Sequence, residues 1–200
     1  MFTIGTKRTG EPKNYTKCEK KKSRKETVMK INHKVPIAIL SASVIAIFGI
    51  KAEEGYRAKP YHDIGKVATV GHGSTVYEDG SKVKITDPPV SRERADKMLR
   101  AHVNKDEAKM KAMLPGVELS QGEYDVYIDF FYNFGAQKFY TSSMRRELLK
   151  GNHVAACRAL LRYRFAAGRD CSRPSNWGSR GCKGVWARTE KRYNNCMAAQ

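Results

Sequence analysis

The stretch "EEGYRAKPYHDIGKVATVGHG", residues 53–73, carries the strongest indication of fold and chemistry in this chain. Glu54 ends an apolar run with helical spacing and precedes Gly55, and glycine is the residue that most often terminates a helix. Asp63 follows nine residues after Glu54, and Thr69 follows six residues after Asp63, among several glycines. We therefore expect one acid at a helix end to face a second acid and a hydroxyl on a small sheet.

Two carboxyl groups placed in this way can attack a glycosidic bond. One acid protonates the leaving oxygen, and the other carboxylate acts on the opposite face of the sugar. Two acids nine residues apart are common, so the spacing alone carries little weight. Glu54 is preferred to Glu53 because only Glu54 is followed by glycine. His62 is interpreted as a surface residue, and a structural role is favoured for His72.

The 200 residues suffice for one compact domain and additional segments, and the net charge of +18 predicts an anionic partner. Nucleic acid, lipid headgroups and acidic polymers all fit that description. Residues 1–34 hold eleven Lys or Arg and three acids, and residues 1–28 contain few large apolar side chains. We expect 1–34 to be a basic, disordered tail. Translation could start at Met1 or Met29, so 1–28 could be an upstream extension.

An uncharged segment, "VPIAILSASVIAIFGI" at residues 35–50, follows this basic block in the manner of an export signal. It is shorter than the roughly 20 residues of a comfortable membrane span. Signal cleavage after Ala52 would leave Glu54 on a frayed chain end, which is a poor place for a catalytic group. The sequence therefore favours an uncleaved, weak membrane anchor over a cleaved signal peptide or a buried core helix.

The remaining chain predicts an α+β fold. A short strand is expected at 67–71, and Asp79-Gly80 marks the turn of a hairpin over 76–85. Ser91 begins a long helix that reaches about Met113, and residues 120–123 form a capping box before an apolar stripe. Residues 133–135 break that helix, and shorter helices are expected at 141–150, 153–163 and 185–197. We predict a small β-containing lobe and a larger helical lobe joined by a long helix.

Three ordered blocks in residues 51–200 resemble the phage-type lysozymes. The first comprises Glu54-Gly55, Tyr61-His62-Asp63 and "TVGHG" at 69–73. The second, "FFYNFGAQKFYTSSMRRELLKGN" at 130–152, is similar to the aromatic-Asn-x-Gly segment that lines the saccharide cleft of that family. The third, "GVWARTEKRYNNC" at 184–196, resembles the family's closing Gly-x-x-x-Arg-x-Glu helix. The resemblance implies a lysozyme-like catalytic domain over 51–200.

The resemblance also implies a reaction and the residues that perform it. Glu54 would be the general acid for the β-1,4 bond between N-acetylmuramic acid and N-acetylglucosamine in peptidoglycan. Asp63 would be the base or electrostatic partner, and Thr69 would help hold the attacking water, which implies inversion. Asn133 and Gly135 would contact saccharide. No cofactor and no metal are expected. Several relatives have histidine where this chain has Ser74, so a salt bridge from that position is in doubt.

The apolar segment resembles that of the signal-anchor-release endolysins of lambdoid phages. These are exported uncleaved, wait in the host inner membrane and act in the periplasm after release. Residues 35–50 would hold Glu54 at the bilayer surface until release, and the protein would be a monomer. Some relatives lock the site with a cysteine near the acid, but this chain has none between Cys18 and Cys157. Membrane topology is therefore the expected control.

The last forty-four residues hold Cys157, Cys171, Cys182 and Cys196, an even and clustered set that fits two disulfides in an oxidising compartment. Zinc would favour closer Cys-x-x-Cys pairs than these intervals provide. Three disulfide pairings are possible. Cys157 with Cys196 and Cys171 with Cys182 is the preferred set, since it would join two helices and close a polar loop.

Two alternatives remain open for the function. A basic nucleic-acid-binding protein would account for the charge, but the Lys and Arg residues outside the tail are scattered and no nucleic-acid motif appears. A lytic transglycosylase would act on the same substrate with a single glutamate and form an anhydro sugar without water. The presence of Asp63 and Thr69 favours a hydrolase.

Overall fold

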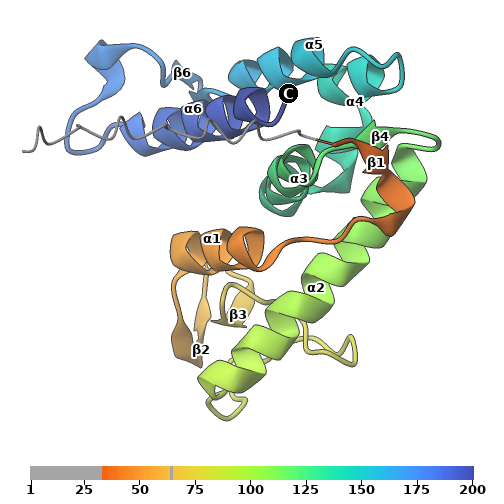
Figure 1. Ribbon diagram of the computed structural model, residues 1–200. Helices are drawn as coiled ribbons and strands as arrows, with labels where there is room; N and C mark the ends of the chain where they lie inside the picture. The colour runs from red at the N-terminus through yellow and green to blue at the C-terminus, as the bar shows by residue number, and fades with distance from the viewer. Residues whose placement is uncertain (1–32, 64) are drawn as a thin grey trace, which may run out of the picture. The chain divides into compact units, whose positions relative to one another are not determined.

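A computed structural model describes residues 33–63 and 65–200 of the chain (Figure 1). The predicted basic tail, with Cys18 and the alternative start Met29, lies outside the described residues except for its last two positions, His33 and Lys34.

The described chain alternates short strands and 3-10 turns with helices. In order, the elements are β1 (Val35–Pro36), η1 (Ile37–Ile39), α1 (Val44–Glu54), β2 (Arg57–His62), β3 (Ala68–Gly71), α2 (Arg92–Met113), β4 (Glu118–Leu119), α3 (Gln121–Tyr140), α4 (Ser143–Leu148), α5 (His153–Ala159), η2 (Leu160–Arg162), β5 (Phe165–Ala166), β6 (Arg169–Asp170), η3 (Pro174–Asn176) and α6 (Lys183–Ala198).

The strands of the described residues pair as small antiparallel ladders, β1 with β4, β2 with β3 and β5 with β6. In the β2–β3 pair, Tyr61 lies opposite Thr69 and Arg57 opposite Gly71, with a register shift between them. The predicted turn at Asp79-Gly80 is confirmed, because the Gly80 N–H donates to the Tyr77 carbonyl at 3.0 Å. The residues on either side of this turn form one isolated bridge, between Val76 and Lys82. The two strands predicted over 76–85 do not form.

Helix α2 joins two apolar clusters and so links the small sheet to the helices (Figure 1). Ala95 and Met98, near its start, pack with Val70, Val83 and Val90 in the smaller cluster. Leu99, Val103 and Met110 belong to the larger cluster with the aromatic residues of α3. The predicted α+β arrangement, with two lobes joined by a long helix, is confirmed.

The helix ends follow the local signals in the sequence. Ser91 caps α2 by accepting a hydrogen bond from the Arg94 N–H at 3.1 Å. Ser120 and Glu123 form the predicted capping box at the start of α3. Gly135 has φ 79° and ψ 166°, so α3 is broken at the predicted position.

The apolar segment 35–50 does not form the single anchor helix that was predicted. It contributes β1, η1 and the first turns of α1, with Ile37, Leu40, Ala42 and Ile50 buried in the larger cluster. Ser43 divides the segment, because its side chain accepts from the Ala46 N–H at 3.1 Å and caps α1. Among the described residues, the helices are too short or too polar to span a bilayer.

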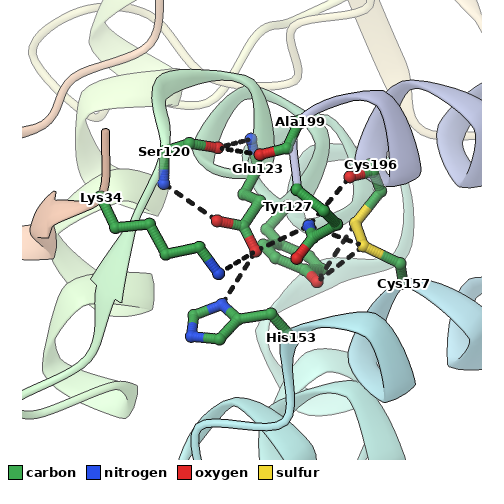
Figure 2. Close-up of a disulfide and its surroundings, with 9 residues drawn as sticks. Lys34, Ser120, Glu123, Tyr127, His153, Cys157, Cys196 and Ala199 are labelled. Carbon is green, nitrogen blue, oxygen red and sulfur yellow. Dashed lines mark hydrogen bonds and ion pairs between the residues drawn. A yellow bond between two sulfur atoms is a disulfide. The ribbon is translucent and has the colours of Figure 1, made fainter. Parts of the chain in front are cut away.

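The four late cysteines form the preferred disulfide set, Cys157–Cys196 and Cys171–Cys182. Figure 2 shows the first of these beside the fully buried Glu123. The Glu123 carboxylate accepts from the Ser120 N–H at 2.9 Å and lies 2.8 Å from the His153 Nδ1. The disulfide and this polar cluster together connect α3, α5 and α6.

We predict unequal contributions of the two disulfides to stability. Their cysteines are 39 and 11 residues apart, and a cross-link that closes a longer loop restricts the unfolded chain more. Replacing Cys157 and Cys196 by alanine should cost about 1 kcal/mol more than the same replacement of Cys171 and Cys182. Urea unfolding of the two double variants measures this difference. A larger loss from the Cys171 and Cys182 variant would contradict the prediction.

Candidate active site

Helix α1 delivers Glu54 to the junction between the helix and the small sheet. The Gly55 N–H closes the helix by donating to the Lys51 carbonyl at 3.0 Å. Gly55 itself has φ 71° and ψ −160°, a conformation that side chains disfavour, and the chain then turns into β2. The predicted position of Glu54 at a glycine-terminated helix end is confirmed.

A glycine loop at the end of β3, residues 71–73, packs against this helix end. A Cβ atom on Gly71 would lie 2.9 Å from the Cβ of Ala95, so the loop approaches α2 as closely as a residue without a side chain allows. A Cβ on Gly73 would lie 3.1 Å from Oε2 of Glu54. The two glycines therefore bring the sheet against both helices and place the Glu54 carboxyl group beside backbone.

The environment of Glu54 raises the pKa of its carboxyl group above the ordinary value. Desolvation is the largest cause, followed by the negative charge of Glu53, with a further contribution from Asp129. Arg188 and His72 act in the opposite direction. The residue is nevertheless exposed, so the carboxyl group combines access to solvent with partial desolvation. Such an acid keeps its proton to a higher pH than an ordinary glutamate does.

Asp63 lies directly after β2, at the turn that connects β2 with β3. Its Oδ1 accepts from the Val67 N–H at 2.8 Å, and its own N–H donates to the Val67 carbonyl at 3.0 Å. These bonds fix the carboxylate while the residue stays exposed. The Asp63 side chain is thus oriented by its own turn and is open to solvent.

Thr69 lies on β3 of the same sheet and is 3% exposed. Its hydroxyl donates to the Val67 carbonyl at 3.0 Å, so the donor is used and the oxygen lone pairs remain as acceptors. Asp63 and Thr69 are therefore both held through Val67. In the part of the chain that the structure describes, hydrogen bonds and ion pairs connect neither of them to Glu54.

The arrangement presents an acid at a helix end and a carboxylate and a hydroxyl on an adjoining sheet. An acid with a raised pKa can donate a proton at neutral pH, and an exposed carboxylate beside a hydroxyl can orient water. These are the groups that hydrolysis of a glycosidic bond requires.

Asn133 and Gly135 lie at the break in α3. The Asn133 amide donates to the Asp129 carbonyl at 2.9 Å, and the residue lines a cavity of about 220 Å³ with Phe134, Phe165, Val185, Arg188 and Arg192. Gly135 is not among the lining residues and acts through the backbone turn that it allows. The structure thus gives Asn133 a place in a cavity wall and Gly135 a conformational role.

Two neighbours of Glu54 were not singled out from the sequence. Arg188 acts on Glu54 through its charge, and it is the arginine of the closing Gly-x-x-x-Arg-x-Glu block. Tyr132 lies in the apolar stripe of α3, and Glu54 contributes to the raised pKa of its hydroxyl after desolvation. The motif could have indicated Arg188, whereas Tyr132 looks like an ordinary core residue in the sequence.

Comparison with known proteins identifies the family of this chain. The family model described as Phage lysozyme matches residues 51–174. The endolysin of Salmonella phage P22 is 30% identical over 132 residues, which cover 66% of this chain and 88% of that protein. The SAR-endolysin of Enterobacteria phage P21 is 28% identical over 167 residues, which cover 82% of this chain and 89% of that protein.

Solved structures show the same fold. A variant of P22 lysozyme superposes with a TM-score of 0.64 at 25% identity, and the match covers 80% of this chain and 99% of that one. The endolysin from Escherichia coli O157:H7 phage FAHEc1 gives a TM-score of 0.65 at 22% identity, with coverage of 81% and 96%. The fold, the helix-end glutamate with its glycine loop, and the family match lead to one conclusion: this chain belongs to the phage lysozyme family and is a glycoside hydrolase.

Proposed function

We propose that this protein hydrolyses the β-1,4 bond between N-acetylmuramic acid and N-acetylglucosamine in peptidoglycan, with Glu54 as the general acid. The observation that carries the proposal is the position of the Glu54 carboxyl group, beside Gly73 and with a raised pKa. A protonated carboxyl group at that helix end can donate to the leaving oxygen.

In this proposal Asp63 and Thr69 act on the other face of the sugar. The exposed Asp63 carboxylate orients or deprotonates water and stabilises positive charge that develops on the sugar ring. The Thr69 hydroxyl donates to Val67, so its oxygen can accept a hydrogen bond from that water. A water attacking opposite to the leaving group would invert the anomeric centre. Asn133, in the wall of the neighbouring cavity, and Gly135 would contact the saccharide.

We further propose that residues 35–50 form an uncleaved anchor that holds the protein in the host inner membrane before it acts as a monomer in the periplasm. In the described residues this segment exposes an unusual concentration of large apolar side chains. The exposed fractions are 73% for Ile39, 64% for Val44, 83% for Ile45 and 63% for Phe48. Such a surface is costly in water and favourable in lipid, which supports a second environment for the segment.

The polar part of the same segment fits a released state. The Ser43 N–H and hydroxyl donate to the Asp125 carboxylate at 3.0 and 2.6 Å, and the Ala42 N–H donates to Glu107. The Gln121 amide donates to the Ser41 carbonyl at 2.8 Å. These contacts join the segment to α2 and α3, and they cannot form while residues 35–50 lie in a bilayer. Release would thus complete the helix that ends at Glu54.

The catalytic proposal predicts that substitution of Glu54 abolishes activity, whereas substitution of the neighbouring Glu53 does not. Glu54→Gln should lose nearly all release of reducing ends from purified peptidoglycan, because the amide cannot donate the required proton. Glu53→Gln is the matched control: it keeps the Glu54 acid and should remain active, with its alkaline limb at lower pH because the charge of Glu53 helps to raise the Glu54 pKa. Reducing-end assays on both purified proteins test this. An active Glu54→Gln variant would disprove the assignment, and anhydro products from the parent would indicate a lytic transglycosylase.

The raised pKa of Glu54 predicts a pH-dependent difference in stability. The folded protein binds this proton more tightly than the unfolded chain, so the stabilisation is present below about pH 4.5 and is lost as pH rises through the folded pKa. Glu54→Gln should therefore be more stable than the parent at pH 7, and the advantage should shrink at pH 4. Urea unfolding at both pH values measures this. Equal stability at pH 7 would contradict the prediction.

The membrane proposal predicts that release of the protein depends on how apolar residues 35–50 are. After collapse of the membrane potential, the parent should move from the membrane to the periplasmic fraction. Ser41→Leu combined with Gly49→Leu should stay in the membrane, because it strengthens the anchor; an added Cβ at Gly49 meets no other atom within 4 Å. Ser41→Ala combined with Gly49→Ala is the control and should be released. Full lysis from a permanently membrane-bound parent would disprove release control.

A further inference from the structure

His72 lies between Gly71 and Gly73 of the glycine loop and is only 4% exposed. Both of its ring nitrogens contact oxygen atoms from other elements. Nδ1 bonds to the carbonyl of Gly55, the residue directly after Glu54, and Nε2 lies 3.0 Å from Oδ1 of Asp96 on α2. The imidazole therefore connects the end of the catalytic helix with the long helix through the glycine loop.

The two partners of His72 define its protonation. A carbonyl oxygen can only accept a hydrogen bond, so Nδ1 must carry a hydrogen. The hydrogen bond from Lys51 is the largest cause that lowers the pKa of Asp96, which makes the Asp96 carboxylate an acceptor as well. A neutral imidazole has one N–H and cannot donate to both. The geometry thus fits an imidazolium ion that donates at both nitrogens.

The contacts of His72 close a ring around the helix end. The Lys51 ammonium group donates to Oδ2 of Asp96 at 2.7 Å, and the Lys51 carbonyl accepts the Gly55 N–H at 3.0 Å. The peptide groups on the two sides of Gly55 are therefore fixed, one by Lys51 within α1 and the other by His72 from the glycine loop. Glu54 lies immediately before this doubly held residue.

We propose that His72 is a positioning residue for the reaction: held by Asp96, it fixes the Gly55 carbonyl and with it the direction in which the helix end presents Glu54. This inference rests on the proposed role of Glu54 as the general acid. The pairing of His72 with Asp96 links the glycine loop to α2 at the same time.

Other charged and polar groups surround the pair and must be considered in any pH experiment. Glu53, Arg188 and Asp129 act on Glu54 together with His72. The aromatic ring of Tyr56 lies 5.7 Å from the imidazole ring, and the Tyr132 hydroxyl donates to the His72 carbonyl at 3.3 Å. His72 is the member of this set that both contacts Gly55 and adds positive charge beside Glu54.

Two amide substitutions separate the contacts of His72. In His72→Asn the amide takes the position of Nδ1 and can still donate to Gly55, whereas in His72→Gln it takes the position of Nε2 and can reach only Asp96. We expect kcat on soluble peptidoglycan fragments to fall on the order of tenfold to hundredfold in His72→Gln, because the acid is misplaced. His72→Asn should retain more activity, and KM should change little in either variant.

The pH profile supplies a readout that a purely structural role would not move. Loss of the imidazolium removes a charge that lowers the Glu54 pKa, so the alkaline limb of kcat should shift to higher pH in both variants. His153→Asn is the matched control, because His153 also contacts a buried carboxylate, that of Glu123 in the helical part (Figure 2). It should lower the unfolding temperature without shifting the alkaline limb.

The outcomes separate this inference from the proposed function. A parent that releases no reducing ends would refute the function itself. An active parent with parental kcat and an unshifted alkaline limb in both folded His72 variants would overturn the positioning role. If those variants do not fold, Asp96→Asn provides the second test, because it removes the carboxylate that holds the imidazolium. It should lower kcat and leave KM unchanged, and an unchanged kcat would overturn the inference.

Discussion

The end of helix α1 at Gly55 is the constraint on which the active site depends. Gly55 has a positive φ, and the chain turns there from the helix into β2, so Glu54 is the last residue with helical geometry. Gly73 lies against the Glu54 carboxyl group, and the His72 imidazole bonds to the carbonyl of the next residue, Gly55. A side chain at Gly73 would press on the Glu54 carboxyl group, whereas one at Gly55 would meet open space but would strain the positive φ that ends the helix.

Residues 35–50, the segment before this helix end, both bury apolar side chains in the core and leave others exposed. Ile37, Leu40, Ala42 and Ile50 complete the larger apolar cluster, whereas other apolar side chains of the same segment remain exposed. Serines and alanines reduce its hydrophobicity enough for the segment to fold against α2 and α3 in water. In the proposed anchor role, the same composition would make it a weak membrane anchor, so that a small difference in environment would decide between the two states.

Local structure was predictable from the sequence because its causes are local. Gly55, Ser91, the Ser120–Glu123 box and the break at Gly135 each act within a few residues, and each was found where predicted. The fold of residues 35–50 was not predicted, because an apolar run has the same sequence pattern whether lipid or a protein core covers it. The partners of His72 were also unpredictable. Asp96 is 24 residues away, and Arg188 reaches Glu54 from the last helix, so only the folded chain brings these charges together.

The Cys157–Cys196 disulfide has a consequence for following this protein in the cell. Disulfides persist in oxidising compartments and are rare in the cytosol, so under the proposed export the bond would form only after the helical part had crossed the membrane. Both cysteines are fully buried beside Tyr127, which protects the bond once it has formed. In that proposal, the redox state of this pair would record which side of the membrane each molecule had reached, independently of whether residues 35–50 had left the bilayer. Alkylation measured at Cys157 and Cys196 would thus distinguish molecules before the proposed export from those after it.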